Sequence, residues 1–193
     1  MVYLNDSIAD FSDEQYEEVL QRVSLQRRET TEKFLNSDDR KRSVIAYVLL
    51  QEALRNEYNI ERAPEFIFNE YGKPFLLSHP DIYFNLSHTE NAVACAVSNT
   101  IVGIDIETIK PFDPELAEYV LNSEELSNVT SLPNPSVAFT ILWTRKESLI
   151  KMLGTGLSDA ETIRNLLKDF PSRHSFQTTV NTQKGYVMTV CNP

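Results

Sequence analysis

Two short segments of this chain carry the residue types best suited to chemistry. They are VGIDIE at residues 102–107 and WTRKESLIK at residues 143–151. Alternate side chains of a β-strand share a face, so Asp105 and Glu107 are expected to point the same way, with the intervening isoleucines in a core. Helix positions four apart are neighbours, so Glu147 and Lys151 are expected to lie together. Because Mg²⁺ binds carboxylates, water and substrate phosphates, these groups predict a magnesium site for a phosphorylated substrate.

Each segment taken singly also has a purely structural interpretation. Alternating apolar and acidic residues are typical of a half-buried strand with one solvated face. A Glu–Lys pair four residues apart is most often a weak surface pair on a helix. The presence of both segments in one chain, in this order, favours the chemical interpretation.

The two segments resemble the paired signature of the 4′-phosphopantetheinyl transferases. The similarity is to the larger, single-chain class, typified by the enzyme that activates surfactin synthetase. Three more segments fit this class: YGKP at residues 71–74, NLSH at residues 85–88 and GTGL at residues 154–157. The resemblance runs from about Arg27 to Leu157 and keeps the order of the motifs, so it is specific.

This resemblance implies an enzyme and its reaction. The family transfers the 4′-phosphopantetheine arm of coenzyme A to a serine of an apo acyl or peptidyl carrier protein and releases 3′,5′-ADP. The resemblance implies that Asp105, Glu107 and Glu147 are catalytic and hold Mg²⁺, which bridges the pyrophosphate and stabilises its developing charge. It further implies that Lys151 neutralises a phosphate, and Glu147 is the candidate base for the carrier serine.

The resemblance also assigns contacts with coenzyme A. The expected contacts come from Arg27, Arg42, Lys73, Ser87, His88 and Lys146. Arg27 and Arg42 occupy positions where the family uses basic residues against the 3′-phosphate, and guanidinium groups bind phosphate in bidentate fashion. Structural alternatives exist: His88 could be a satisfied structural histidine, Lys73 an exposed turn residue, and Lys146 could point to solvent.

Composition and charge exclude several functions. The 193 residues are 41% hydrophobic and 24% charged, which suits one or two small domains with a real core. A net charge of −10 argues against nucleic-acid binding, which depends on basic surface. The chain shows neither an apolar membrane span nor a signal peptide, so no membrane association and a cytoplasmic location are expected. Cys95 and Cys191 lie in apolar runs and are expected to be buried, inert thiols.

The residue pattern predicts the elements that must position these groups. Helices are expected from Ser12, from Ser37 to about Tyr58, from Glu115 to Leu121 and onward from Ser123, from Asn134-Pro135 through Lys151, and from a capping box at Ser158 to about Lys168. Strands are expected at 66–68, 82–84, 92–97, 101–107, 174–180 and 186–190, with a turn at 71–74. The strands at 92–97 and 101–107 are predicted to form a hairpin through residues 98–100.

Helices and antiparallel strands are grouped rather than strictly alternating, which favours an α+β fold. The resemblance implies two similar α+β halves packed as a pseudo-dimer in one chain, with coenzyme A between them. We expect an N-terminal half at residues 1–100 and a C-terminal half at 101–193 that carries both metal-site segments. Such a duplicated chain is expected to act as a monomer. The sequence after Leu157 is shorter than in the larger members, a difference expected to leave the metal site unaffected.

Two other functions fit parts of the sequence. The first is a magnesium-dependent nuclease or phosphohydrolase, but such strand enzymes usually carry Glu-x-Lys, and here Lys110 follows Glu107 by three positions. The second is a non-catalytic module that binds nucleotide or carrier protein, which would not need the carboxylates and the lysine intact. The sequence does not select the carrier's pathway among fatty acid, polyketide, nonribosomal peptide, other secondary metabolism and lysine biosynthesis.

Overall fold

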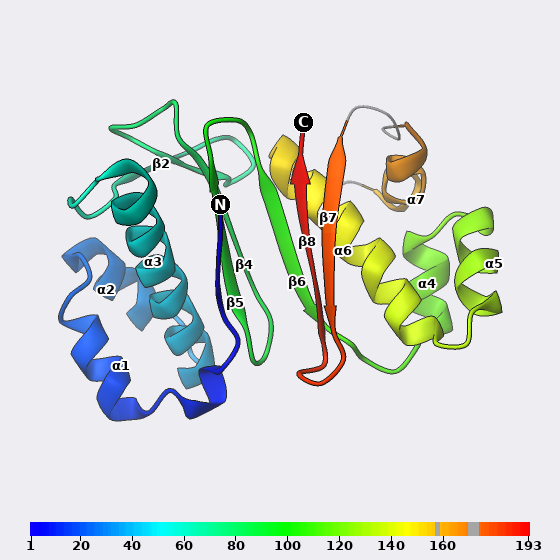
Figure 1. Ribbon diagram of the computed structural model, residues 1–193, viewed down its shortest axis with the longest axis horizontal. Helices are drawn as coiled ribbons and strands as arrows, with labels where there is room; N and C mark the ends of the chain where they lie inside the picture. Colours follow the sequence, from blue (N-terminus) through cyan, green and yellow to red (C-terminus); the bar gives the residue numbers. More distant parts are fainter. Residues whose placement is uncertain (157–158, 170–173) are drawn as a thin grey trace.

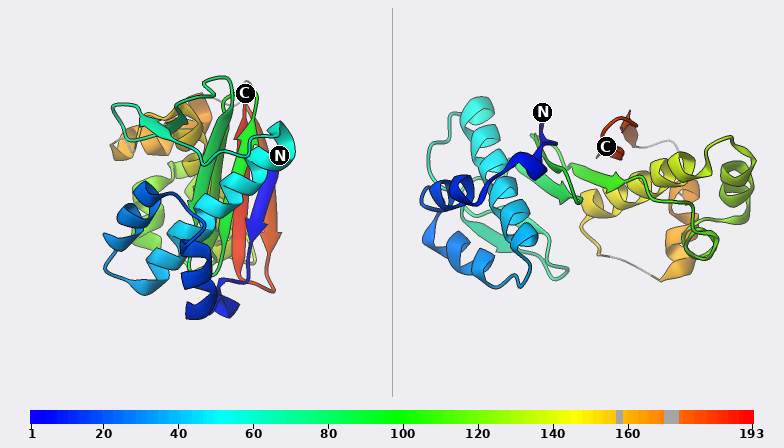
Figure 2. Two further views of the ribbon diagram at one scale, coloured as in Figure 1. Left: turned by 90° about the vertical axis from the view of Figure 1, so that its left-hand side faces the viewer. Right: turned by 90° about the horizontal axis from the view of Figure 1, so that it is seen from below.

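The computed structural model describes residues 1–156, 159–169 and 174–193. Figure 1 shows one group of helices at each end of the molecule, with the strands between them. The view from below in Figure 2 shows the same arrangement along the long axis. The predicted α+β fold with two similar halves is confirmed.

An antiparallel sheet forms the centre of the N-terminal half. Its strands, in spatial order, are β1 (Val2–Asn5), β5 (Val93–Ser98) and β4 (Tyr83–His88). Helix α3 (Ser37–Tyr58) packs across this sheet and shares its largest core. The helix begins where the Asn36 side chain accepts a hydrogen bond from the Asp38 N–H, and it ends at Asn59 in the left-handed conformation. The predicted helix from Ser37 to Tyr58 is therefore confirmed.

Smaller elements surround this sheet. They are the 3-10 turn η1 (Ile8–Asp10), α1 (Asp13–Leu20), α2 (Leu25–Glu32), β2 (Phe66–Phe68) and β3 (Pro74–Leu76). Ser12 and Gln15 form the predicted capping box of α1. Strands β2 and β3 pair with each other and enclose a tight turn. The elements β1, α2 and β3 are absent from the sequence prediction because they are short, and α2 contains a single apolar residue.

The C-terminal half has its own antiparallel sheet. Its strands, in spatial order, are β6 (Gly103–Thr108), β8 (Tyr186–Asn192) and β7 (Ser175–Asn181). Helix α6 (Pro135–Leu153) packs on this sheet. The Asn134 side chain accepts from the Val137 N–H, and Gly154 ends the helix at φ 70°. Both boundaries agree with the sequence prediction.

The far end of the C-terminal half is a cluster of short helices. They are α4 (Pro114–Val120), α5 (Ser123–Ser131) and α7 (Ala160–Asp169). Their apolar residues pack around Val129 and Ile163 against the start of α6. The predicted capping residue Ser158 of α7 lies outside the described residues. Within them, the Asp159 Oδ1 atom accepts from the Thr162 N–H at 3.0 Å.

The predicted hairpin of residues 92–107 is wrong. Both strands exist, but β5 pairs with β1 and β4, whereas β6 pairs with β8. The connection at 99–102 carries the chain from one half to the other, so it is a crossover and not a hairpin turn. A local pattern of two apolar runs does not specify which strand pairs with which.

Side chains, and not backbone pairing, join the two sheets. Three alternate polar residues, Asn85 and Ser87 in β4 and Thr89 just after it, accept hydrogen bonds from backbone N–H groups of β6. The donors are Ile104, Ile106 and Thr108, with donor–acceptor distances of 2.8, 3.2 and 3.1 Å. We call this set of contacts the β4–β6 ladder. These hydrogen bonds set how β6 is aligned along β4, and so how the two halves are aligned with each other.

Two further expectations are tested by the fold. Cys95 and Cys191 are free and buried, and burial raises the pKa of each thiol to about 12, so both are inert as predicted. Within the described residues, no helix has the length and apolar character needed to span a membrane.

Candidate active site

The site begins with the close approach of α6 to β6. Gly103, Asp105 and Glu107 alternate along β6 and so share the face that contacts the helix. A Cβ atom on Gly103 would lie 1.9 Å from the Ser148 carbonyl oxygen and 2.5 Å from the Met152 nitrogen. Only glycine permits this packing. The close approach brings Glu147 and Lys151 of α6 to the carboxylates of β6.

Asp105 is the centre of the site. Its side chain is 1% exposed, and its Oδ1 atom accepts from the Ser87 hydroxyl at 2.9 Å and from the Lys151 ammonium at 2.6 Å. Lys151 also donates to the Ser87 Oγ atom at 2.9 Å. The Oδ2 atom of Asp105 is buried and has no hydrogen-bond partner within the described residues. An unpaired buried carboxylate oxygen is costly, so a cation or a hydrogen-bond donor at this oxygen would stabilise the site.

The negative charges of Glu107 and Glu147 are unfavourable beside that of Asp105. Burial, with the charge of Asp105 second, raises the pKa of Glu107 to about 7, and Glu147 adds to the same effect. Burial and then Asp105 also raise the pKa of Glu147 above its usual value. Lys151 opposes both shifts but does not cancel them. The three carboxylates therefore form a locally acidic site that a cation would stabilise.

These residues fit a hard divalent cation by their chemistry. All the donors are carboxylate oxygens, and one of them is unpaired. Their side chains do not form a ready-made cage, since no group of three or more acidic, histidine or cysteine residues in the described chain is arranged around a common point. The fit therefore rests on donor type, burial and mutual repulsion.

A pocket of about 260 Å³ opens beside this acidic site. Its lining comes from four segments singled out in the sequence: 71–74, Asn85 with Leu86, three residues of 143–151, and Gly154 with Gly156. Leu157, the last residue of the GTGL motif, lies outside the described residues. Segments distant in the sequence thus meet at one pocket, with Glu147 and Lys151 on its wall.

His88 and Arg42 lie on the N-terminal side of this region. His88 ends β4, and its pKa is lowered by desolvation and by the positive charges of Arg42 and Lys151. Arg42 donates to the Glu90 carbonyl at 3.2 Å and pairs with Asp39 at 2.6 Å. The charges that act on His88 thus come from two ion pairs, Arg42 with Asp39 and Lys151 with Asp105, and the two carboxylates oppose the lowering of its pKa.

Comparison with known proteins identifies the family. The model described as "4′-phosphopantetheinyl transferase, N-terminal" matches residues 10–100, and that of the "4′-phosphopantetheinyl transferase superfamily" matches residues 101–191. The chain belongs to the 4′-phosphopantetheinyl transferase superfamily. It is 32% identical to the 4′-phosphopantetheinyl transferase Sfp of Bacillus subtilis, over 93% of this chain and 86% of that protein. The enzyme class and the reaction expected from the sequence are thereby confirmed.

A second relative supports the same membership. The 4′-phosphopantetheinyl transferase gsp of Aneurinibacillus migulanus is 38% identical over 70% of this chain and 57% of that protein. Members of the family use coenzyme A to modify carrier proteins.

Lys73 lies in the pocket wall but has protein partners. Its ammonium donates to the Lys151 and Met152 carbonyl oxygens, both at 2.7 Å, and burial lowers its pKa to about 8. These bonds close the last turn of α6. In this transferase Lys73 is therefore neither the exposed turn residue of the structural alternative nor a free ammonium.

Two of the expected coenzyme A contacts lie elsewhere. Lys146 is fully buried, and its ammonium donates to Glu125 at 2.7 Å and to the carbonyls of Val120, Ile163 and Arg164 at 2.8–3.0 Å. It faces α4, α5 and α7, so neither the predicted phosphate contact nor the solvent alternative is correct. On the helix, Lys146 and Glu147 are adjacent and so point about 100° apart.

The Arg27 side chain also binds other residues of the protein. Its guanidinium donates to the Ser43 carbonyl at 2.6 Å and to the Ser43 hydroxyl at 2.8 Å, and it lies 5.4 Å from the centre of the Tyr47 ring. Burial lowers its pKa. These contacts fasten α2 to α3 and contradict the expected contact with the 3′-phosphate in this conformation.

Sequence reasoning assigned no role to three residues that hold the site together, although Asn85 lies in the NLSH motif. Asn85 and Thr89 belong to the β4–β6 ladder, and Asn69 accepts from the Tyr71 and Lys73 N–H groups at 3.0 and 2.8 Å. An asparagine two residues before Tyr71-Gly72 is a turn signal that could have identified Asn69. The alternation of polar residues at 85, 87 and 89 gives the matching signal for the ladder.

Proposed function

We propose that this transferase moves the phosphopantetheine arm of coenzyme A to a carrier-protein serine at Asp105, Glu107, Glu147 and Lys151, with Mg²⁺ as cofactor. The observation that carries the proposal is that Glu147 and Lys151 lie on the wall of one pocket while the Lys151 ammonium binds Asp105, which lies beside Glu107 on β6. The unpaired Oδ2 atom of Asp105 and the raised pKa values of both glutamates support a cation among the three carboxylates. When bound, Mg²⁺ would offset negative charge on the pyrophosphate oxygens.

Lys151 is proposed to meet the pyrophosphate. Its side chain is 29% exposed, so its ammonium contacts Asp105 on one side and remains accessible from the pocket on the other. A positive charge at this point opposes the charge that develops on the leaving group. Glu147, whose pKa is raised toward neutrality, is our candidate base for the carrier serine.

The nucleotide part of coenzyme A is proposed to lie in the pocket next to Tyr71, Lys73 and Leu86. Arg42 and His88 are proposed to receive the 3′-phosphate, next to the Ser87 hydroxyl that Asp105 and Lys151 hold in place. Pocket size, apolar walls and two lysines support this placement. The 260 Å³ volume suits part of the cofactor, and the remainder would extend toward the carrier protein.

The carrier domain is proposed to dock over the helix α4 side of the site. A second pocket of about 260 Å³ lies beside Glu107 and is lined by Leu116, Phe139 and Trp143. Leu116 and Tyr119 of α4 are 46% and 53% exposed, which is high for large apolar side chains. This chain has a net charge of −10, so an acidic carrier protein would be repelled at long range. Binding through an apolar patch does not depend on charge attraction. The proposal includes action as a monomer in the cytoplasm, without nucleic acid or membrane as partner.

A mass assay tests the function. The protein is incubated with coenzyme A, an apo carrier protein and magnesium or EDTA, and the intact mass of the carrier is recorded. We expect a gain of one phosphopantetheine arm with magnesium and none with EDTA. An unchanged carrier with hydrolysed DNA or hydrolysed coenzyme A would instead support the nuclease or phosphohydrolase alternative. Binding of coenzyme A without turnover would support a non-catalytic module.

A further inference from the structure

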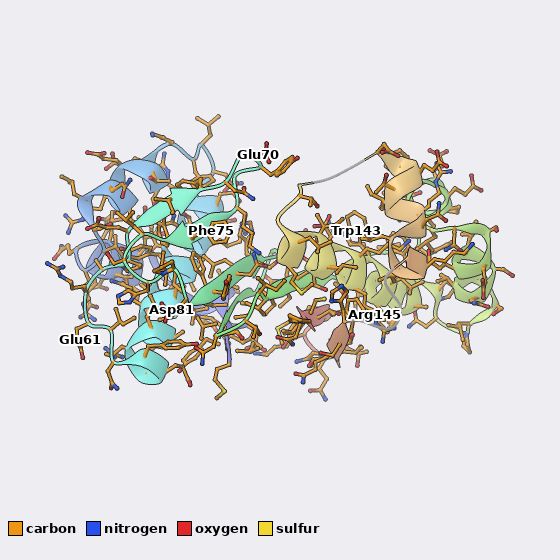
Figure 3. The ribbon with its side chains drawn as sticks, turned by 90° about the horizontal axis from the view of Figure 1, so that it is seen from above. Glu61, Glu70, Phe75, Asp81, Trp143 and Arg145 are labelled. Atoms are coloured by element: carbon orange, nitrogen blue, oxygen red, sulfur yellow. The ribbon has the colours of Figure 1, made fainter. Side chains whose placement is uncertain are left out.

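Asn69 connects the two walls of the pocket without lining it. Its Nδ2 group donates to the Gly154 carbonyl at 2.9 Å, and its Oδ1 atom accepts from the N–H groups of Tyr71 and Lys73. In Figure 3 the neighbouring residue Glu70 marks the turn between β2 and β3, which reaches from the N-terminal half toward the end of α6. One amide side chain therefore shapes the turn and attaches it to the opposite half.

The contact between this turn and the end of α6 is tight. A Cβ atom on Gly154 would lie 2.7 Å from the Lys73 Cδ atom and 3.3 Å from the Asn69 Nδ2 atom. Lys73 binds the carbonyls of Lys151 and Met152, while Asn69 binds that of Gly154. The last carbonyls of a helix have no partners within it. A turn of the N-terminal half thus caps the helix that carries the catalytic groups of the C-terminal half.

We propose that Asn69 is a positioning residue that sets the width of the coenzyme A pocket, an inference that rests on the proposed function of this pocket. One wall contains Tyr71 to Pro74, and the other contains Ile150, Lys151 and Gly154. The walls come from segments about eighty residues apart in the chain, so only non-covalent contacts fix their separation. Two side chains bridge the walls: the Lys73 ammonium binds the Lys151 and Met152 carbonyls, and the Asn69 amide binds the N–H groups of Tyr71 and Lys73 on one wall and the Gly154 carbonyl on the other.

The same geometry predicts which kinetic constant depends on Asn69. The Lys151 ammonium is held by Asp105 and Ser87, and neither contact involves the turn. Loss of the Asn69 amide leaves these reacting groups in place and removes one of the bonds that hold the pocket wall, with the Lys73 bonds remaining. Binding of coenzyme A should therefore weaken while the chemical step is preserved.

The test is Asn69→Ser. A serine hydroxyl can still accept from the turn N–H groups, but it is too short to reach the Gly154 carbonyl. We expect the KM and the calorimetric Kd for coenzyme A to rise about three- to tenfold, the effect of one lost hydrogen bond, with kcat and the KM for carrier protein changed less than about twofold. The matched control is Asn181→Ser, since the Asn181 Oδ1 atom accepts from the Lys184 N–H in the turn between β7 and β8. It should leave the Kd for coenzyme A unchanged.

The outcomes separate this inference from the proposed function. If the wild-type protein does not bind coenzyme A, the proposed function fails and the inference with it. If the wild type binds but Asn69→Ser has the same Kd and KM, or loses kcat alone, the inference is overturned and the proposed function stands. Should Asn69→Ser not fold, Asn69→Asp gives the same reading because it keeps the acceptor and loses the donor. Failure of both variants to fold would overturn the positioning role in favour of a structural one.

Discussion

Glu107 is the residue at which catalysis and stability oppose each other. It lies on β6 beside Asp105, and its pKa of about 7 shows that its negative charge is unfavourable in the folded chain. In the unfolded chain it would ionise near its ordinary value of 4.5. A site that collects three carboxylates for a cation is therefore destabilising until the cation arrives.

The variant Glu107→Gln should lose activity and gain stability. Removing the charge removes the repulsion. The free energy of unfolding of the metal-free variant should therefore exceed that of the wild type by about 1 kcal/mol at pH 8. Glu107 lowers the free energy of unfolding only when it is ionised in the folded chain. This loss is absent below about pH 4.5 and complete above about pH 7, so the variant should be no more stable than the wild type at pH 4. Chemical denaturation in EDTA at both values measures it. Equal stability at pH 8, or full transferase activity, would contradict the assignment.

Magnesium binding should release protons near neutral pH. Below pH 7 the metal-free protein holds a proton on Glu107, and a metal ligand must lose it. The apparent Mg²⁺ affinity should therefore fall about tenfold from pH 8 to pH 6. Calorimetry in two buffers of different ionisation enthalpy would detect the released proton. An affinity that is independent of pH would remove Glu107 from the metal site.

At the scale of elements, the site depends on how closely α6 lies on β6. The alternation of β6 and the four-residue spacing of α6 predicted which residues share a face. These predictions are confirmed by the burial of Ile104 and Ile106 and by the position of Glu147 and Lys151 in the wall of one pocket. Periodicity does not say what covers the remaining faces of a helix. For that reason the burial of Lys146 against α4, α5 and α7 could not be predicted from the sequence.

The variant Gly103→Ala should not tolerate this packing. Its methyl group would overlap the Ser148 carbonyl, which is backbone and cannot rotate away. We expect a loss of about 3 kcal/mol or more in the free energy of unfolding, or an insoluble protein. A thermal melt measures the first outcome. The control is Gly185→Ala in the turn between β7 and β8, where a Cβ atom meets nothing within 4 Å, although its φ of 70° adds a small cost. Equal loss in both variants would contradict a steric role for Gly103.

At the scale of the whole molecule, three of the sets of polar contacts that the described residues make between the halves bear on the site and on stability. The β4–β6 ladder lies in the middle, and the Asn69 turn lies at the end of α6. The third set joins Asp6, after β1, to Lys184 at 2.7 Å and to the Tyr186 hydroxyl at 3.0 Å. These contacts lower the pKa of Asp6, with Lys184 as the main cause. Local pattern can mark some of the residues involved, such as Asn69 and the polar alternation at 85, 87 and 89, but it does not give their partners, because the fold brings each pair together.

The variant Asp6→Asn should weaken the third set without affecting catalysis. Its contacts are partly exposed, so we expect a loss of about 1 kcal/mol at pH 7. Since the folded pKa of Asp6 lies below its ordinary value of 3.8, the stability it contributes is present above that value and is lost as the pH falls through the folded pKa. The difference between variant and wild type should therefore disappear in acid. A changed KM for coenzyme A at pH 7 would show that this contact also shapes the site.

The β4–β6 ladder has a consequence for any attempt to cut the chain in two. A fragment that began at residue 101 would expose the amide edge of β6, deprived of the hydroxyl and amide oxygens that now cover it. Bare strand edges recruit other strands, so such a fragment should self-associate. Adding the N-terminal fragment as a separate chain should restore solubility. The boundary between β4 and β6 is therefore a suitable place to divide the protein into a split reporter.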